Sequence, residues 1–264
     1  MADVPSPPRP TSPLTPSERL TTALAEADRT FGPRTGSIGP VDACTHCFDA
    51  EHLRIIGGPV DDIPDWLFSR ALSKWGTTMD PDVRLWRRLT PRILREMTAG
   101  ALHIDESLMA RKFNEAGWRD WPPREMAVLE DVCHAWWQAA LAGMSHVSAV
   151  TVLGFVVPFT RDVQIWLDHW DTCQDRAAAL QLRDLWQSWM SDLLDGRLDV
   201  SFSGEGPDIA APVSAWMLRQ PPQQLDLGDF NAQERYGLHL LALTETQRNA
   251  DSGSSEEAAA TVRP

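Results

Sequence analysis

Apolar residues recur every three or four positions along most of the chain between residues 41 and 248. Such spacing places them on one face of a helix and predicts amphipathic α-helices. In one such segment Trp66, Leu67, Ala71 and Trp75 recur at helical spacing. Only residues 197–203 alternate with a period of two, and a single short strand would have no partner. The pattern therefore predicts an all-α fold.

Capping residues, glycines and prolines divide this pattern into nine or ten helices joined by short turns. Asp49 and Asp105 precede apolar runs and are expected N-caps, whereas Gly196 is expected to end a helix. Thr90-Pro91 is interpreted as the start of a new helix, and Pro158 as the end of one. The candidate segments number twelve, more than the nine or ten helices expected, and cover about 18–29, 49–56, 62–75, 82–89, 92–99, 105–117, 123–142, 145–157, 160–173, 176–194, 208–219 and 230–248.

No fixed internal period is found, so the sequence favours an irregular multi-helix bundle, with a HEAT-like helical stack as the second choice. Residues 1–16 contain six of the 20 prolines and are expected to be a disordered tail. A short helix and a Gly- and Pro-rich linker follow over 17–40. A single all-α domain is expected over 41–248, and a disordered polar tail over 249–264.

The chain of 264 residues carries a formal net charge of −13. Residues 1–40 have four acids and four bases, and 249–264 have three acids and one base, so the predicted domain carries most of the charge. This balance argues against nucleic acid or an anionic membrane as the main partner. No apolar run is long enough to span a bilayer, and no secretory signal is visible, which favours a cytoplasmic protein with reduced thiols.

Twelve tryptophans are interpreted mainly as packing between helices. Trp136 and Trp137 are adjacent, so only one of them is expected to point squarely inward. Trp118 and Trp121 lie in the turn Gly-Trp-Arg-Asp-Trp-Pro, which offers the best place for an aromatic binding surface. Trp121 could instead be a hydrophobic staple for the helix that follows.

One short motif carries possible chemistry, because Cys44 and Cys47 are spaced as half of a tetrahedral zinc site. His46 lies between them, and a distant His or Cys would have to complete the site. The same four residues resemble the active-site motif of thiol–disulfide oxidoreductases of the thioredoxin superfamily, but Thr45 stands where Pro is common, and the β-α-β framework is absent. The third alternative is that both thiols are small buried apolar groups.

Two polar groups extend the candidate binding surface. His103 precedes Asp105 and Glu106, which indicates either a helix cap or a carboxylate–imidazole pair for acid–base chemistry. Arginines at helical spacing, among them Arg88 and Arg92, indicate either a solvated face paired with local acids or a site for an acidic partner or a phosphate.

Three segments resemble uncharacterised all-helical bacterial proteins with no assigned activity: Asp-Ala-Cys-Thr-His-Cys (42–47), Leu-Thr-Pro-Arg-Ile-Leu (89–94) and Gly-Trp-x-x-Trp-Pro (117–122). The resemblance covers about residues 41–195 and implies one helical body. It supplies no mechanism and no catalytic residues.

These observations favour a non-catalytic helical interaction or scaffold protein whose partner is another protein. A zinc-binding protein using Cys44, Cys47 and His46 is the first alternative, and zinc is the one cofactor that the sequence suggests. An enzyme with a Trp-lined cleft near His103 is the second. The sequence does not indicate the oligomeric state.

Overall fold

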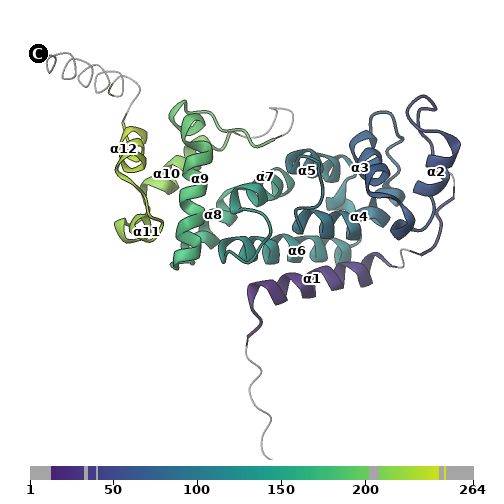
Figure 1. The fold of residues 1–264 in the computed structure, drawn as a ribbon, viewed down its shortest axis with the longest axis horizontal. Coiled ribbons are helices and arrows are strands. Elements are labelled where there is room, and N and C mark those ends of the chain that lie inside the picture. The colour runs from purple at the N-terminus through teal and green to yellow at the C-terminus, as the bar shows by residue number, and fades with distance from the viewer. Residues whose placement is uncertain (1–12, 33–34, 40, 202–207, 244–246, 248–264) are drawn as a thin grey trace, which may run out of the picture.

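The fold was obtained as a computed structural model, which describes residues 13–32, 35–39, 41–201, 208–243 and 247. Within these residues the chain is all-helical and has no β-strand (Figure 1). This confirms the predicted fold class, with twelve α-helices instead of nine or ten. The predicted tail over 249–264, and residues 1–12 of the other tail, lie outside the described residues.

The α-helices are α1 (Pro16–Phe31), α2 (Ala50–Ile56), α3 (Asp65–Lys74), α4 (Val83–Thr98), α5 (Glu106–Glu115), α6 (Pro123–Leu141), α7 (Ala149–Thr160), α8 (Gln164–Asp171), α9 (Arg176–Leu194), α10 (Ala210–Leu218), α11 (Pro222–Leu227) and α12 (Ala232–Leu241). Two short 3-10 helices, η1 (Val60–Asp62) and η2 (Trp118–Asp120), lie between them.

The helices form the irregular bundle that the sequence predicts (Figure 1). α1 lies alongside α6 and also contacts α4, so the helix expected before the domain packs against it. α7 contacts α5, α6 and α9, which places it between the two ends of the molecule. α2 and α3 lie at one end, and α10, α11 and α12 pack on α9 at the other.

Aspartate caps begin several helices where the sequence indicates them. The Asp49 carboxylate accepts from the His52 N–H over 2.8 Å, and Asp105 accepts from the N–H groups of the first turn of α5. Asp175 caps α9 in the same way, and that helix has the predicted bounds. Local capping chemistry therefore sets these helix starts.

Two proline-based boundaries are wrong. Pro91 lies inside α4, and Pro158 lies inside α7. A proline within a helix removes one backbone hydrogen bond and is unfavourable. Both prolines are surrounded in sequence by fully buried residues, such as Ile93 and Phe159, so tertiary packing outweighs the local penalty. Thr160, the first residue of the helix expected over 160–173, instead ends α7, and α8 begins at Gln164.

The expectation that only one of Trp136 and Trp137 points inward is also wrong. Their exposed fractions are 2% and 0%, respectively. Trp136 contacts Phe155 of α7, whereas Trp137 contacts Trp166 and Trp170 of α8. Because α6 is covered on two sides, neighbouring residues that point about 100° apart are both buried. The two indoles thereby connect separate parts of the core.

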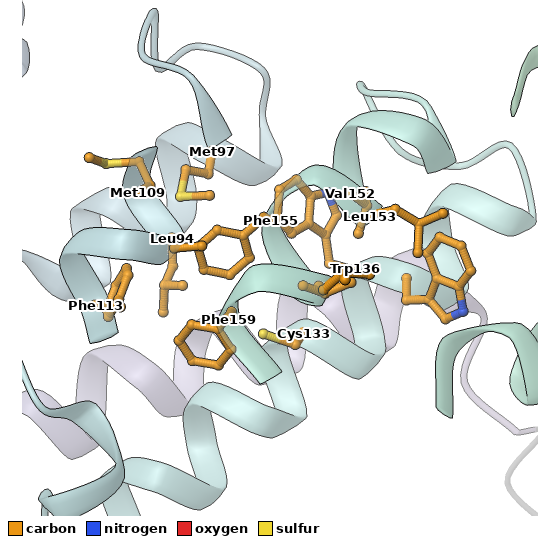
Figure 2. Close-up of a cluster of buried hydrophobic side chains, with 14 of the residues drawn as sticks. Leu94, Met97, Met109, Phe113, Cys133, Trp136, Val152, Leu153, Phe155 and Phe159 are labelled. Atoms are coloured by element: carbon orange, nitrogen blue, oxygen red, sulfur yellow. The ribbon is translucent and has the colours of Figure 1, made fainter. Parts of the chain in front are cut away.

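Phenylalanines of α5 and α7 fill the space between these helices and α6 (Figure 2). The Phe113 ring centre lies 6.0 Å from that of Phe155 and 5.7 Å from that of Phe159. Both contacts are edge-on, a favoured arrangement for aromatic pairs. Leu94 of α4 and Cys133 of α6 belong to the same buried cluster.

One of the two lysines of the chain is completely buried. Lys112 of α5 has an exposed fraction of 0%, and its ammonium donates to the Trp75 carbonyl just after α3. This nitrogen also lies 6.0 Å from the centre of the Trp75 ring. Burial lowers the pKa of Lys112, because the charged form loses water. The lysine therefore fastens the end of α3 to α5.

We expect two helical glycines to respond oppositely to substitution by alanine. A Cβ at Gly237 of α12 would lie 2.7 Å from the fully buried Trp186 ring, whereas a Cβ at Gly154 of α7 would meet no atom within 4 Å. Gly237→Ala should therefore destabilise the protein by about 1–3 kcal/mol through overpacking. Gly154→Ala should stabilise it by about 0.5–1 kcal/mol. Urea unfolding measures both, and equal effects would contradict this packing of α12 on α9.

Candidate functional site

The Cys-x2-Cys motif lies in a turn between the linker and α2. The Cys47 N–H donates to the Cys44 carbonyl over 2.9 Å, which closes a β-turn. The Cys44 N–H donates to the Thr78 carbonyl over 2.7 Å, so the turn is attached to the loop after α3. Cys44 and His46 are exposed, and Cys47 is half-buried. The motif therefore lies at the surface on a fixed segment of backbone.

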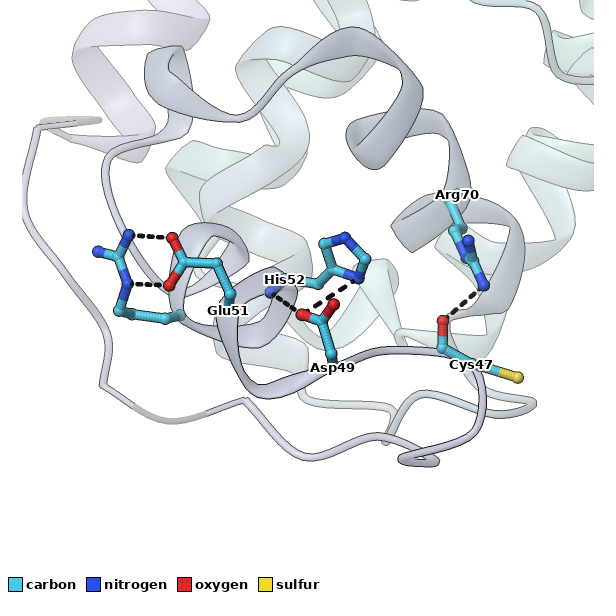
Figure 3. Close-up of polar contacts among 6 residues, drawn as sticks. Cys47, Asp49, Glu51, His52 and Arg70 are labelled. Carbon is cyan, nitrogen blue, oxygen red and sulfur yellow. Dashed lines mark hydrogen bonds and ion pairs between the residues drawn. The ribbon is translucent and has the colours of Figure 1, made fainter.

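Arg70 of α3 holds the other side of this turn (Figure 3). Its Nη2 atom donates to the Cys47 carbonyl over 2.5 Å, and its guanidinium lies 5.3 Å from the centre of the Phe48 ring. Phe48 is itself buried. These contacts together fix the backbone position of Cys47.

The remaining candidate metal ligands lie on other helices. Cys133 is buried in the core on α6 (Figure 2). The Cys173 thiol, just after α8, donates to the His169 carbonyl over 3.7 Å. His134 packs on Trp166 with ring centres 4.9 Å apart. In the described part of the chain no group of three or more His, Cys, Asp and Glu side chains could hold a metal ion. Zinc binding by the Cys-x2-Cys motif stays a prediction from its spacing.

The thiols differ in their tendency to ionise. Hydrogen bonds from the backbone N–H groups of His46 and Cys47 lower the pKa of Cys44. Burial raises the pKa of Cys133, and partial burial raises the pKa of Cys173. Because the thiolate is the nucleophile and the metal ligand, Cys44 has the environment of a reactive cysteine.

Both tryptophans of the predicted aromatic surface are buried. Trp118 stacks on Phe159 with ring centres 4.0 Å apart, and its indole N–H donates to Asn114 over 3.2 Å. The Trp121 indole N–H donates to the Ala116 carbonyl over 3.0 Å. These side chains hold the turn between α5 and α6 against α7, so they present almost no area to a ligand in this structure.

The two arginines of the predicted surface contact the protein itself. Arg92 is almost fully buried and donates to the carbonyls of Val60 and Ile63. It also pairs with Asp65 and with Glu96 of its own helix. The Arg88 guanidinium donates to backbone carbonyls in the linker and after α2. Both side chains therefore tie α4 to the segment over 36–65.

His103 is exposed just before α5. Among the contacts of the described residues, no hydrogen bond or ion pair joins it to Asp105 or Glu106. The Asp105 carboxylate instead accepts from the N–H groups of Ser107 and Leu108, at 2.9 and 3.1 Å. This confirms the interpretation of Asp105 as a helix cap.

Asp105 and Glu106 nevertheless line a pocket that the sequence did not indicate. It has a volume of about 500 Å³ and lies among the N-terminus of α5, the middle of α7, the C-terminal half of α9 and residues 198–201. We call it the acidic pocket. Its lining consists of Asp105, Glu106, Ser107, Val150, Thr151, Gly154, Trp189, Asp192, Leu198, Asp199, Val200 and Ser201.

The charged side chains of the acidic pocket are all carboxylates. Asp105, Glu106, Asp192 and Asp199 line it, and within the described residues no Lys, Arg or His does. Burial and the neighbouring Asp105 raise the pKa of Glu106. No ion pair to Glu106 is found in the described part of the chain. The pocket therefore holds the Glu106 carboxylate in a partly dehydrated position beside a second carboxylate.

Sequence reasoning missed Asp192, Asp199 and Trp189 because nothing in their local spacing distinguishes them. Asp192 and Trp189 lie within a long amphipathic helix, where an acid and an aromatic residue are ordinary. Only the packing of α9 against α7 brings them toward Asp105. No local motif could have found the site.

A second, smaller groove follows the contact between α1 and α6. Its volume is about 420 Å³, and its lining mixes apolar residues such as Leu14 and Val128 with both signs of charge, including Arg19, Glu26 and Asp131. Because it contains charges of both signs, its lining favours neither a cationic nor an anionic ligand.

Comparison of the chain with protein-family models, with curated proteins and with solved structures finds no significant match. No helix of the described residues is long and apolar enough to cross a membrane. The functional assignment therefore rests on the geometry of this chain.

We expect Arg92→Met to destabilise the protein by about 3 kcal/mol, because the buried Val60 and Ile63 carbonyls and the Glu96 carboxylate would lose their donor. Methionine keeps much of the side-chain volume, so the loss reports on the guanidinium. Arg84→Met is the matched control on the same helix, since Arg84 is exposed and, among the described residues, pairs only with Asp82. Urea unfolding of both variants tests this. Similar losses in both would show that Arg92 does not hold the segment over 60–65.

Proposed function

We propose that this chain is a non-catalytic helical interaction protein that binds a basic segment of another protein, with a Lys or Arg side chain entering the acidic pocket. The observation that carries the proposal is that four carboxylates from three separate parts of the chain line one pocket. A guanidinium or ammonium supplies both the positive charge and the N–H donors that carboxylates accept.

The uncharged polar groups of the pocket support the same choice of ligand. Thr151 and Ser107 also line the pocket, and the Ser107 hydroxyl donates to Asp105, which leaves its oxygen to accept from a ligand. In an α-helix the N–H of residue 158 would donate to the carbonyl of Gly154, four residues earlier. Pro158 has no N–H, so this carbonyl lacks its helical donor. That carbonyl belongs to a residue that lines the pocket. Hydrogen-bond acceptors therefore predominate, and a ligand rich in donors matches them.

The size and aromatic content of the pocket fit a long basic side chain. A volume of about 500 Å³ lies within the range of small-ligand sites. Trp189 can contact a cation through its ring face, an interaction that favours Arg over Lys. Gly154 leaves open space on one wall, since a Cβ there would meet no atom within 4 Å.

The charge of the whole chain supports a basic partner as well. A net charge of −13 attracts positively charged segments over long distances and repels nucleic acid. A half-buried Glu106 without a salt-bridge partner is unfavourable for folding, and a bound cation would compensate for its charge.

The enzyme alternative keeps one supporting observation, the raised pKa of Glu106 beside Asp105. The imidazole that it required is elsewhere, because His103 does not line the pocket formed by the described residues. Binding of a cation uses the negative charge that the carboxylates share and needs no imidazole. For this reason we favour binding over acid–base chemistry.

We expect a labelled peptide of alternating Arg and Gly to bind the full-length protein, and the double variant Asp192→Asn/Asp199→Asn to bind it about tenfold or more weakly, because charge-assisted hydrogen bonds contribute about 1.5–3 kcal/mol. Gly154→Leu should also weaken binding, since the leucine side chain would fill the pocket. Fluorescence anisotropy at about 0.15 M salt measures the affinities.

Asp184→Asn is the matched control, because Asp184 is exposed on the same helix, α9, and does not line the pocket. It should bind the peptide like the original protein. Equal weakening by Asp184→Asn and by the pocket variants would mean that only general charge attraction acts. A glutamate–glycine peptide that bound as tightly would contradict the proposal directly.

We expect Glu106→Gln to weaken peptide binding but not to reduce stability at pH 7. The pKa of Glu106 is raised in the folded protein, so folding favours its protonated form and stability falls as pH rises through that pKa. Glutamine removes this loss, and the difference between the two proteins should vanish below about pH 4. Thermal unfolding across pH 3–8 measures it. A variant that is less stable at pH 7 would reveal a stabilising partner for Glu106.

A further inference from the structure

Cys44 differs from the other three cysteines in both access and surroundings. It is exposed, whereas Cys133 is fully enclosed by the core and Cys173 is half-buried beside the His169 carbonyl. Its N–H donates to the Thr78 carbonyl and its own carbonyl accepts from the Cys47 N–H, so its backbone is fixed while its side chain is open to solvent. Access from solvent makes Cys44 the cysteine best suited to attack a dissolved electrophile.

The turn places a second thiol within reach of the first. Cys44 and Cys47 are the first and last residues of the β-turn closed by the hydrogen bond of 2.9 Å. The Cα atoms at these two positions lie less than about 7 Å apart by definition of the turn. Disulfides join Cα atoms about 4.4–6.8 Å apart. A bond between the two sulfurs therefore requires only rotation of side chains and slight adjustment of the turn.

Contacts on both sides keep this geometry in place. Thr78 accepts from the Cys44 N–H, and Arg70 donates to the Cys47 carbonyl. Asp80 donates its N–H to the Asp42 carbonyl over 3.0 Å, which adds a second attachment next to the turn. The backbone of Cys44 is thus attached to the loop after α3, and the backbone of Cys47 is attached to α3 itself.

We propose that Cys44 and Cys47 form a reversible dithiol–disulfide switch that a low-molecular-weight disulfide such as oxidised glutathione oxidises. The Cys44 thiolate attacks one sulfur of the glutathione disulfide, whose S–S bond breaks, and one glutathione thiolate leaves. The Cys47 thiol gives up its proton to solvent and attacks Cys44 Sγ, which releases the second glutathione. The two protein thiols lose two electrons, and the disulfide gains them as two thiols.

The switch is separate from the acidic pocket. The pocket is lined by residues of α5, α7 and α9 and by 198–201, whereas the turn contacts α3 and the loop after it. A failure of peptide binding would therefore not contradict the proposed switch, and a failure of the switch would not contradict the proposed binding in the pocket.

The test treats the full-length protein, first reduced and exposed to a chelator, with buffers of increasing oxidised-to-reduced glutathione ratio. Remaining thiols are then labelled with N-ethylmaleimide and located by peptide mass mapping. We expect labels at Cys44 and Cys47 to disappear together, and labels at Cys133 and Cys173 to remain. Persistence of both labels at every ratio would overturn the proposal.

Two single variants separate the steps. Cys47→Ser should accumulate glutathione on Cys44, because nothing resolves the mixed disulfide. Cys44→Ser should leave Cys47 unmodified, because the attacking thiolate is gone, and Cys173→Ser should behave like the original protein. Glutathione accumulating on Cys47 of the Cys44→Ser variant as fast as on Cys44 of the Cys47→Ser variant would overturn the assigned order. Circular dichroism confirms that each variant keeps its helices.

Kinetic labelling gives a readout that does not depend on oxidation. With limiting N-ethylmaleimide at pH 7, we expect Cys44 to react about tenfold or more faster than Cys173, since Cys44 is exposed and Cys173 is half-buried. Equal rates would overturn the reactivity that the proposal needs. About one zinc ion per chain, with both motif thiols unreactive until a chelator is added, would identify the pair as a metal site and overturn the switch.

Discussion

Contact between buried aromatic rings determines where most helices of this protein lie. Trp75 after α3 packs on Trp86 of α4 with ring centres 4.7 Å apart, and Trp86 packs on Phe113 of α5. Phe113 contacts Phe155 of α7, which in turn contacts Trp136 of α6. A second series begins at the neighbouring residue and runs through Trp137, Trp170 and Trp216 to α10. The two series meet at consecutive positions of α6, so this helix must be covered on two sides.

This packing is strong enough to leave polar groups without partners. The indole N–H groups of Trp86, Trp136, Trp137 and Trp186 are buried without a hydrogen-bond acceptor among the described residues. Each such group costs about 1–3 kcal/mol. Burial of the rings and contacts between them must therefore stabilise the fold by more than these unmade hydrogen bonds cost. Around this core, guanidinium groups such as that of Arg92 bind several loop carbonyls at once, a task for which the planar fork of arginine is better suited than lysine.

The sequence predicted what local chemistry decides and missed what packing decides. The caps at Asp49 and Asp105 follow from short-range hydrogen bonds, which a pattern can indicate. Pro91 and Pro158 break the same local rules, because burial on both sides of each proline outweighs the lost hydrogen bond. For the same reason the sequence identified the Cys-x2-Cys turn but not the acidic pocket. The turn is a contiguous segment, whereas Asp105, Asp192 and Asp199 meet only after α5, α7 and α9 have packed.

The buried position of Lys112 has a practical consequence for handling the molecule. The chain has two lysines, and with Lys112 enclosed beside Trp75 only Lys74 presents a side-chain amine to solvent. Lys74 is the last residue of α3, which lies at the end of the molecule opposite α9 (Figure 1). Amine-directed coupling to a dye or a solid support, at a pH that spares other groups, would use this side chain and the chain's amino terminus. Attachment through Lys74 would hold the protein in one defined orientation.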